Sequence, residues 1–118
     1  MLHELADRCE VYLVTGYTDM RKGIDGLAAM IQGRLLLDPF GKSLYLFCGR
    51  NQSKIKGLLW EEDGFLLLYK RLENGSFRCP RNETEAKKLT PQQIRWLLEG
   101  LSIEQPKAIK PSCSKDIY

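Results

Sequence analysis

Hydrophobic residues recur at helical spacing in the first third of the chain. Intervals of three or four residues place five of them on one face of a helix: Met20, Ile24, Leu27, Ile31 and Leu35. Thr18 precedes this run and has a side chain suited to capping a helix. Asp38-Pro39 ends it, because proline lacks the backbone N–H that a helix requires. The pattern predicts a long helix over residues 19–37, after a short β-prone run at Val11–Val14.

The middle third alternates short apolar runs with turn sequences, which is typical of antiparallel strands joined by hairpins. Asp63-Gly64 and Asn74-Gly75 are residue pairs that favour two-residue turns. The strands are expected at residues 44–48, 54–60, 65–72 and 76–80.

The turns decide which side chains share a face of this sheet, since successive residues of a strand point to opposite sides. With two-residue turns, Lys56 lies opposite Arg71, and Arg71 lies opposite Arg78. One face then collects basic and aromatic side chains, namely Lys54, Lys56, Trp60, Tyr69, Arg71 and Arg78. The other face is apolar except for Lys70, which the pattern does not explain, and is expected to pack under the 19–37 helix.

The last third contains the clearest helix signal. Thr90-Pro91-Gln92-Gln93 combines an N-cap, a proline at the first helical position and a glutamine at the third, which together form a capping box. Gly100 ends this helix. Its buried residues are expected to be Ile94, Leu97, Leu98 and Leu101.

These elements predict an α+β fold, in which an antiparallel β-meander of four to five strands packs against one long helix, with a short C-terminal helix. The length of 118 residues suits one domain. Residues 1–103 are expected to form that domain, and residues 104–118 a flexible, mildly basic tail.

Composition narrows the class of protein. The chain is 43% hydrophobic and 28% charged, as ordinary globular proteins are. It has no run near the ~18 apolar residues of a membrane span and no secretory signal at its start, so we expect a cytoplasmic protein with no membrane partner. The cysteines form no Cys-x-x-Cys pair and the single histidine is His3, which argues against zinc. In that compartment we expect reduced thiols.

The net charge of +3 conceals an uneven distribution. Residues 42–81 hold eight basic and four acidic side chains. A row of Lys56, Arg71 and Arg78 would destabilise the sheet, because like charges lie opposite one another. Beside Trp60 and Tyr69, such a row suits a phosphate backbone with stacking bases. Alternatively, long basic side chains simply cover an exposed sheet face and protect it from aggregation.

Catalytic signals are weak. No Ser-His-Asp or Cys-His arrangement can be assembled, since His3 lies at a terminus that we expect to fray. Five acidic residues are the candidates for a magnesium-dependent nuclease site: Asp19, Asp25, Glu61, Glu62 and Asp63. Acidic residues are ordinary at a hairpin tip and on a helix surface, so we expect no catalytic residue, no metal and no cofactor.

Three blocks of the chain carry a specific resemblance. The first runs from Val11 through Thr18-Asp19-Met20-Arg21-Lys22 to Ala28, the second from Lys56 to Phe77, and the third from Leu89-Thr90-Pro91 to Gly100. In order and spacing they resemble the TnpB (Orf2-like) accessory proteins of insertion sequence 66 elements. Cys79 departs from the pattern, where an aromatic residue is expected. The matching positions that are candidates for interaction are Asp19, Arg21, Lys22, Lys56, Trp60, Lys70 and Arg71.

The resemblance implies a bacterial mobile-element protein encoded beside a separate transposase, needed for transposition but not itself catalytic. Two functional hypotheses follow. In the first, the protein contacts element DNA through the basic and aromatic sheet face, with Arg21 and Lys22 extending that surface. In the second, it is an adaptor that docks on the transposase without touching DNA, with Trp60 or Trp96 as the anchor. The oligomeric state is open.

Overall fold

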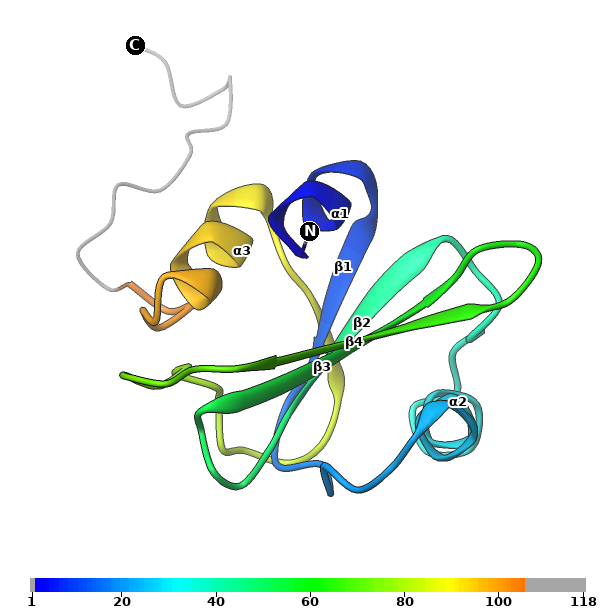
Figure 1. The fold of residues 1–118 in the computed structure, drawn as a ribbon, viewed down its shortest axis with the longest axis horizontal. Helices are drawn as coiled ribbons and strands as arrows, with labels where there is room; N and C mark the ends of the chain where they lie inside the picture. The colour runs from blue at the N-terminus through cyan, green and yellow to red at the C-terminus, as the bar shows by residue number, and fades with distance from the viewer. Residues whose placement is uncertain (1, 106–118) are drawn as a thin grey trace, which may run out of the picture.

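A five-stranded mixed sheet with helices on both faces forms the centre of the molecule (Figure 1). The computed structural model describes residues 2–105. The sheet has the strand order β4-β3-β2-β1-β5, with β1 at Glu10–Val14, β2 at Ser43–Cys48, β3 at Lys54–Trp60, β4 at Phe65–Arg71 and β5 at Ala86–Lys88. The helices are α1 (Leu2–Arg8), α2 (Ile24–Gly33) and α3 (Pro91–Leu98). The α+β class is therefore confirmed.

The expected all-antiparallel meander is wrong at β1 and β2. These strands run parallel, with Glu10 beside Ser43 and Val14 beside Phe47, whereas the other strand pairs are antiparallel. The segment between β1 and β2 contains α2 and crosses over one face of the sheet. A crossover of this kind returns the chain to the same end, so that the second strand runs in the direction of the first.

The β3–β4 hairpin has a register two residues away from the expected one. Lys54 pairs with Arg71, and Lys56 pairs with Tyr69. The turn takes four residues instead of two, because the N–H of Glu61 donates to the carbonyl of Gly64 at 2.8 Å. A shift by an even number keeps each side chain on its expected face, so Lys54, Lys56, Tyr69 and Arg71 still share one side of the sheet.

The last strand of the sheet lies elsewhere than expected. Residues 76–80 are not a strand. The N–H of Phe77 donates to the carbonyl of Gln52 at 2.7 Å, in the turn between β2 and β3. The edge strand next to β1 is β5, which pairs with it. The predicted pairing of Arg71 with Arg78 is therefore wrong.

The helix expected at 19–37 is shorter and lies on the other face of the sheet. It begins after Gly23, because the preceding residues form a separate turn in which the N–H of Lys22 donates to the carbonyl of Asp19 at 3.0 Å. Its buried residues, Leu27 and Ile31, match the predicted stripe. They pack with Tyr45, Phe47 and Leu58, on the face that also carries Lys56. The prediction of one long helix that packs under the apolar face is therefore wrong.

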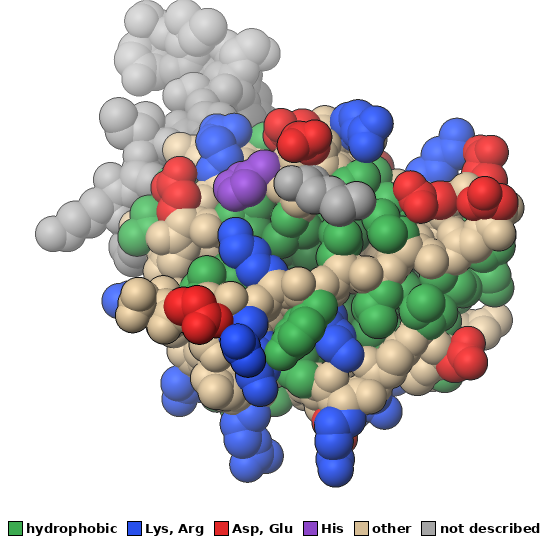
Figure 2. Space-filling view, viewed as in Figure 1, with side chains coloured by type: hydrophobic (Ala, Val, Ile, Leu, Met, Phe, Trp, Pro, Cys, Tyr) green, Lys and Arg blue, Asp and Glu red, His purple; other side chains and the backbone are tan. Residues whose placement is uncertain are grey.

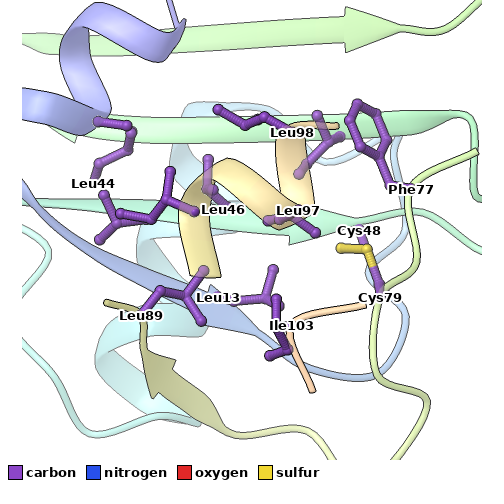
Figure 3. Packing of buried hydrophobic residues seen from close by; sticks show 14 of the residues in the cluster. Leu13, Leu44, Leu46, Cys48, Phe77, Cys79, Leu89, Leu97, Leu98 and Ile103 are labelled. Carbon is purple, nitrogen blue, oxygen red and sulfur yellow. A yellow bond between two sulfur atoms is a disulfide. The ribbon is translucent and has the colours of Figure 1, made fainter. Parts of the chain in front are cut away.

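The apolar face of the sheet is covered by α1 and α3, whose side chains meet strand residues such as Leu13, Leu46 and Ile55. Figure 3 shows Leu97 and Leu98 of α3 in this cluster. The sequence did not indicate α1: instead of fraying, it buries Leu5 and Ala6. Lys70 projects from this face but is exposed, since β4 is the other edge strand and Lys70 lies near its end.

The C-terminal helix is confirmed in detail. The Thr90 hydroxyl accepts from the N–H of Gln93 at 3.1 Å, and the Gln93 side chain accepts from the N–H of Thr90 at 2.9 Å. Gly100 follows the helix with φ of +80°. The predicted burial of Leu101 is wrong: it is 43% exposed, and Ile103 fills the core instead.

Cys48 and Cys79 form a disulfide, so the expectation of reduced thiols is wrong for this pair (Figure 3). The two residues are 31 positions apart, and they meet because the segment around Phe77 packs into the core at the end of β2. Cys9 is a half-buried free thiol, and Cys113 lies outside the described residues.

The predicted flexible tail, 104–118, lies outside the described residues except for Glu104 and Gln105. The carboxylate of Glu104 is 2.7 Å from the ammonium of Lys87. Within residues 2–105, no helix combines the length and the apolar character that crossing a membrane demands.

Candidate nucleic-acid interface

Four of the predicted contact residues meet at one end of the β3–β4 hairpin. Lys54 lies opposite Arg71, and Lys56 lies opposite Tyr69, so all four project from the sheet face on which α2 packs. We call these four residues the basic patch. Tyr69 and Arg71 are exposed and both lysines are half-buried, which leaves the patch open to a partner.

Lys56 connects the patch to the segment before α2. Its ammonium donates to the carbonyl oxygen of Lys22 at 2.9 Å and lies 5.5 Å from the centre of the Tyr69 ring. The cation is attracted to the electron-rich face of the ring. The Tyr69 side chain is nevertheless 54% exposed, so part of the ring remains available for contact. Lys22 itself is exposed beside the patch.

Arg71 makes an ion pair that leaves it accessible. Its Nε lies 3.1 Å from Oε2 of Glu73, and both side chains are mostly exposed. Exposed pairs of this kind contribute little stability, since water and salt screen them. A phosphate group can therefore compete with Glu73 for the Arg71 guanidinium.

Arg21 is held in a fixed position by Asp19. The guanidinium binds both carboxylate oxygens, with Nε to Oδ1 at 3.0 Å and Nη2 to Oδ2 at 2.8 Å. Hydrogen bonds from the side chain and backbone of Arg21 hold the pKa of Asp19 well below its usual range, and the same pair raises the pKa of Arg21. Both groups therefore stay ionised at neutral pH.

Arg50 joins this surface, although the sequence analysis did not single it out. It lies in the turn between β2 and β3, and with Arg21 and Lys54 it lines a hollow of about 440 Å³. The two loops that form the hollow approach closely because Gly49 has no side chain: a Cβ there would lie 2.6 Å from Cγ of Met20. The sequence feature that could have identified Arg50 is its position as a basic residue in a predicted turn next to Lys54.

Trp60 does not belong to the basic patch. It shares the patch's face of the sheet but lies six residues from Lys54, which corresponds to about 20 Å along a strand. Its ring packs against Phe40 at 5.0 Å and Phe65 at 4.9 Å between centroids. The predicted combination of Trp60 with the row of cations is therefore wrong.

Arg78 is also separate. It lines a different hollow, of about 590 Å³, together with Gln52, Arg81 and Glu104. Its neighbours in the chain, Phe77 and Cys79, point into the core between the sheet, α1 and α3.

The charge distribution is visible on the surface of the molecule. Figure 2 shows that Lys and Arg side chains predominate over the lower part of the view, whereas acidic side chains lie mainly along its upper edge and sides. The loop between β1 and α2 and the turn between β2 and β3 both lie at the bottom of the same view in Figure 1. The basic end of the hairpin is thus continuous with these two loops.

The acidic residues considered for a metal site do not form one cluster. Within the described part of the chain, no group of three or more His, Cys, Asp or Glu side chains is placed to hold a metal ion. Glu61, Glu62 and Asp63 lie in the exposed turn between β3 and β4.

Comparison with known proteins places the chain among insertion-sequence proteins. The family model described as IS66 Orf2 like protein matches residues 9–108. The uncharacterized protein y4hO of Sinorhizobium fredii is 38% identical over 96 residues, covering 81% of this chain and 84% of the relative. A second protein of that organism, the uncharacterized protein y4jC, is 29% identical over 91 residues, covering 77% and 78%. No solved structure matches the chain.

Proposed function

The chain belongs to the IS66 Orf2-like family of insertion-sequence proteins, and from that premise we propose that it is a non-catalytic accessory protein of transposition that contacts element DNA through the basic patch. The partner in this function is the element-encoded transposase, which supplies the cutting and joining chemistry.

The observation that supports DNA contact is the pairing of Lys54 with Arg71 beside Lys56 and Tyr69. Two cations directly opposite each other destabilise a strand pair, and a DNA phosphate between them removes that repulsion. Neutralising phosphates also releases counterions, which favours binding. The exposed ring of Tyr69 offers a surface on which a sugar or base can pack.

A salt titration with DNA duplexes tests this function. The parent protein should bind a duplex from the element ends, with affinity falling as salt rises by a log–log slope of about −0.9 per phosphate contact. Arg71→Gln should make the slope shallower by about one contact. Arg95→Gln is the matched control, because Arg95 is exposed on α3, on the opposite face of the sheet. Equal slopes for the two variants would show that the basic patch does not contact the DNA.

The adaptor function is the second candidate, and the aromatic cluster at the other end of the hairpin favours it. Phe40 is 52% exposed and packs edge-to-face on the half-buried Trp60. Exposed aromatic residues of this kind anchor many protein interfaces. Trp96 is half-buried on α3. Co-purification with the transposase from a nuclease-treated lysate, lost in Phe40→Ser but kept in Arg71→Gln, would support the adaptor.

A further inference from the structure

The hollow between the two loops is lined by cations from three segments of the chain. Arg21 comes from the loop before α2, Arg50 from the turn after β2, and Lys54 from the start of β3. The acidic side chain in the lining is Asp19, and Arg21 already neutralises it. The charge of the other two cations therefore makes the hollow positive.

Neither of these two cations is engaged within the protein. Among residues 2–105, the side chains of Arg50 and Lys54 have no ion pair and no hydrogen bond, in contrast to Arg21, Arg71, Lys87 and Lys88. A guanidinium presents a planar set of donors that matches two oxygens of a phosphate, and an ammonium adds a point charge.

Thr18 is a buried polar residue in the same hollow. Thr18 is one of the residues that line the hollow, and only 4% of it is exposed. Its hydroxyl is the buried side-chain polar atom that lacks a hydrogen-bond partner in the described part of the protein. Its backbone N–H donates to the carbonyl of Cys48 at 2.8 Å, which fixes residue 18 at the end of β2. Buried polar groups normally have a partner, so this hydroxyl indicates an incomplete site.

The hollow is continuous with the basic patch through Lys54, which belongs to both. Tyr17, 37% exposed, stands in its lining. Two free cations, together with the polar groups of Thr18 and Asn51, can bind the two anionic non-bridging oxygens of a phosphodiester. A strand of DNA that crosses the patch presents such an anion at every nucleotide.

We propose that this hollow holds one backbone phosphate of the bound DNA, with Arg50 and Lys54 supplying the charge and the Thr18 hydroxyl completing the hydrogen bonds. The assignment rests on the proposed DNA contact and adds to it: Arg50 and Thr18 lie outside the basic patch. It makes the hollow the point at which the DNA backbone is positioned on the protein.

Two conservative variants test the assignment against the parent on the same duplex. Arg50→Gln should lower the steepness of the log–log salt dependence by about 0.9, as the loss of one phosphate contact does. Thr18→Val has nearly the same volume, removes the unpartnered hydroxyl and keeps the charge. It should weaken DNA binding with the salt slope unchanged, and it should raise the melting temperature of the free protein. A variant that binds less well while being more stable cannot owe its defect to misfolding.

The outcomes separate this assignment from the proposed function. In one outcome, the parent binds the duplex and Arg71→Gln weakens binding, but Arg50→Gln and Thr18→Val bind as the parent does. The hollow is then not a phosphate-binding site, and the basic patch remains the proposed DNA-binding surface. If the parent does not bind DNA, both are overturned.

Inorganic phosphate is the second probe, because it presents anionic phosphate oxygens without the rest of the DNA. Amide resonances of Thr18 and Asn51 should move with the duplex and only weakly with phosphate at matched ionic strength. If phosphate alone saturates these shifts and the duplex leaves them unmoved, the hollow binds a free anion and the assignment to DNA is wrong.

Discussion

The two ends of the β3–β4 hairpin are stabilised in different ways. At the end with Trp60 and Phe65, three aromatic rings lie 4.9–5.4 Å apart between centroids, and apolar contact holds the strands together. At the end with Lys54 and Arg71, like charges face each other. That end has backbone hydrogen bonds, such as the N–H of Leu72 to the carbonyl of Ser53 at 2.7 Å. The disulfide links the end of β2 to the segment that follows β4.

This difference shows how one pair of strands can both stabilise the fold and present charged residues to a binding partner. Packing of the aromatic end supplies stability, so that the basic end can keep exposed charges that oppose its own strand pairing. The disulfide between Cys48 and Cys79 adds stability that offsets this repulsion. Changes at the two ends should accordingly affect different properties, and the following predictions are ordered from the largest expected effect to the smallest.

Loss of the disulfide should have the largest effect on stability. Cys79→Ser opens a link between residues 31 apart, and in the chain-entropy description this costs about 3.5 kcal/mol of unfolding free energy. Urea unfolding of the parent with and without reductant measures it. Cys9→Ser is the control, since Cys9 is a free thiol. If reductant leaves the parent's midpoint unchanged, the disulfide does not stabilise the protein.

Removing the ring of Trp60 should weaken the aromatic end. Because Trp60 is half-buried against two rings, Trp60→Ala is expected to cost about 3 kcal/mol, at the low end for aromatic truncations. At a temperature where the variant is folded, DNA affinity should match the parent. A large loss of affinity in the folded variant would show that the two ends are not separable.

Reversing one charge at the basic end should move stability and binding in opposite directions. Lys54→Glu places a carboxylate opposite Arg71 and replaces a repulsion by an attraction, with a gain of about 0.5 kcal/mol in unfolding free energy. DNA binding should fall sharply, because the change subtracts one cation and adds one anion. Chemical denaturation measures the change in stability, and a binding titration on the same preparation measures the change in affinity. Lys88→Glu, on the far edge strand, is the control for the binding titration only, because it also breaks the ion pair of Lys88 with Glu10.

Acid pH should have the smallest effect. The pKa of Asp19 is lowered from the ordinary 3.8 by the Arg21 guanidinium and N–H. The stability from this pair is therefore fully present above the unfolded pKa and is lost as the pH falls through the lower folded value. NMR titration should find the Asp19 carboxyl still ionised at a pH at which an ordinary aspartate is protonated. Arg21→Gln should return the Asp19 pKa to its ordinary range.

Local sequence signals predicted the elements that depend on neighbouring residues. The capping box of Thr90 and Gln93 is present because both partners lie within one turn of helix. The positions of β2, β3 and β4 follow from runs of apolar and β-branched or aromatic residues between turn sequences. The division of the hairpin's side chains between faces survived an incorrect register, since alternation depends only on whether the shift is even or odd.

The residues of the candidate site were harder to predict from the sequence than the secondary-structure elements. Lys54, Lys56, Tyr69 and Arg71 are brought together as expected, but by a four-residue turn that the Asp63-Gly64 signature did not indicate. Arg50 was visible only as a basic residue in a predicted turn and Thr18 only as a candidate helix cap, because their proximity depends on the approach of two loops. Trp60 lies on the expected face of the sheet but at the other end of the hairpin, and Arg78 lies outside the sheet.

The sequence by itself determined the family, the helix at Pro91–Leu98, the hairpin strands and the concentration of positive charge in the middle of the chain. These follow from local geometry, or from residues that are read in order. The tertiary structure decided that β1 and β2 run parallel, that α2 packs on the charged face, and that Cys48 meets Cys79. Each of these depends on the free energy of packing segments distant in sequence, which no local pattern records.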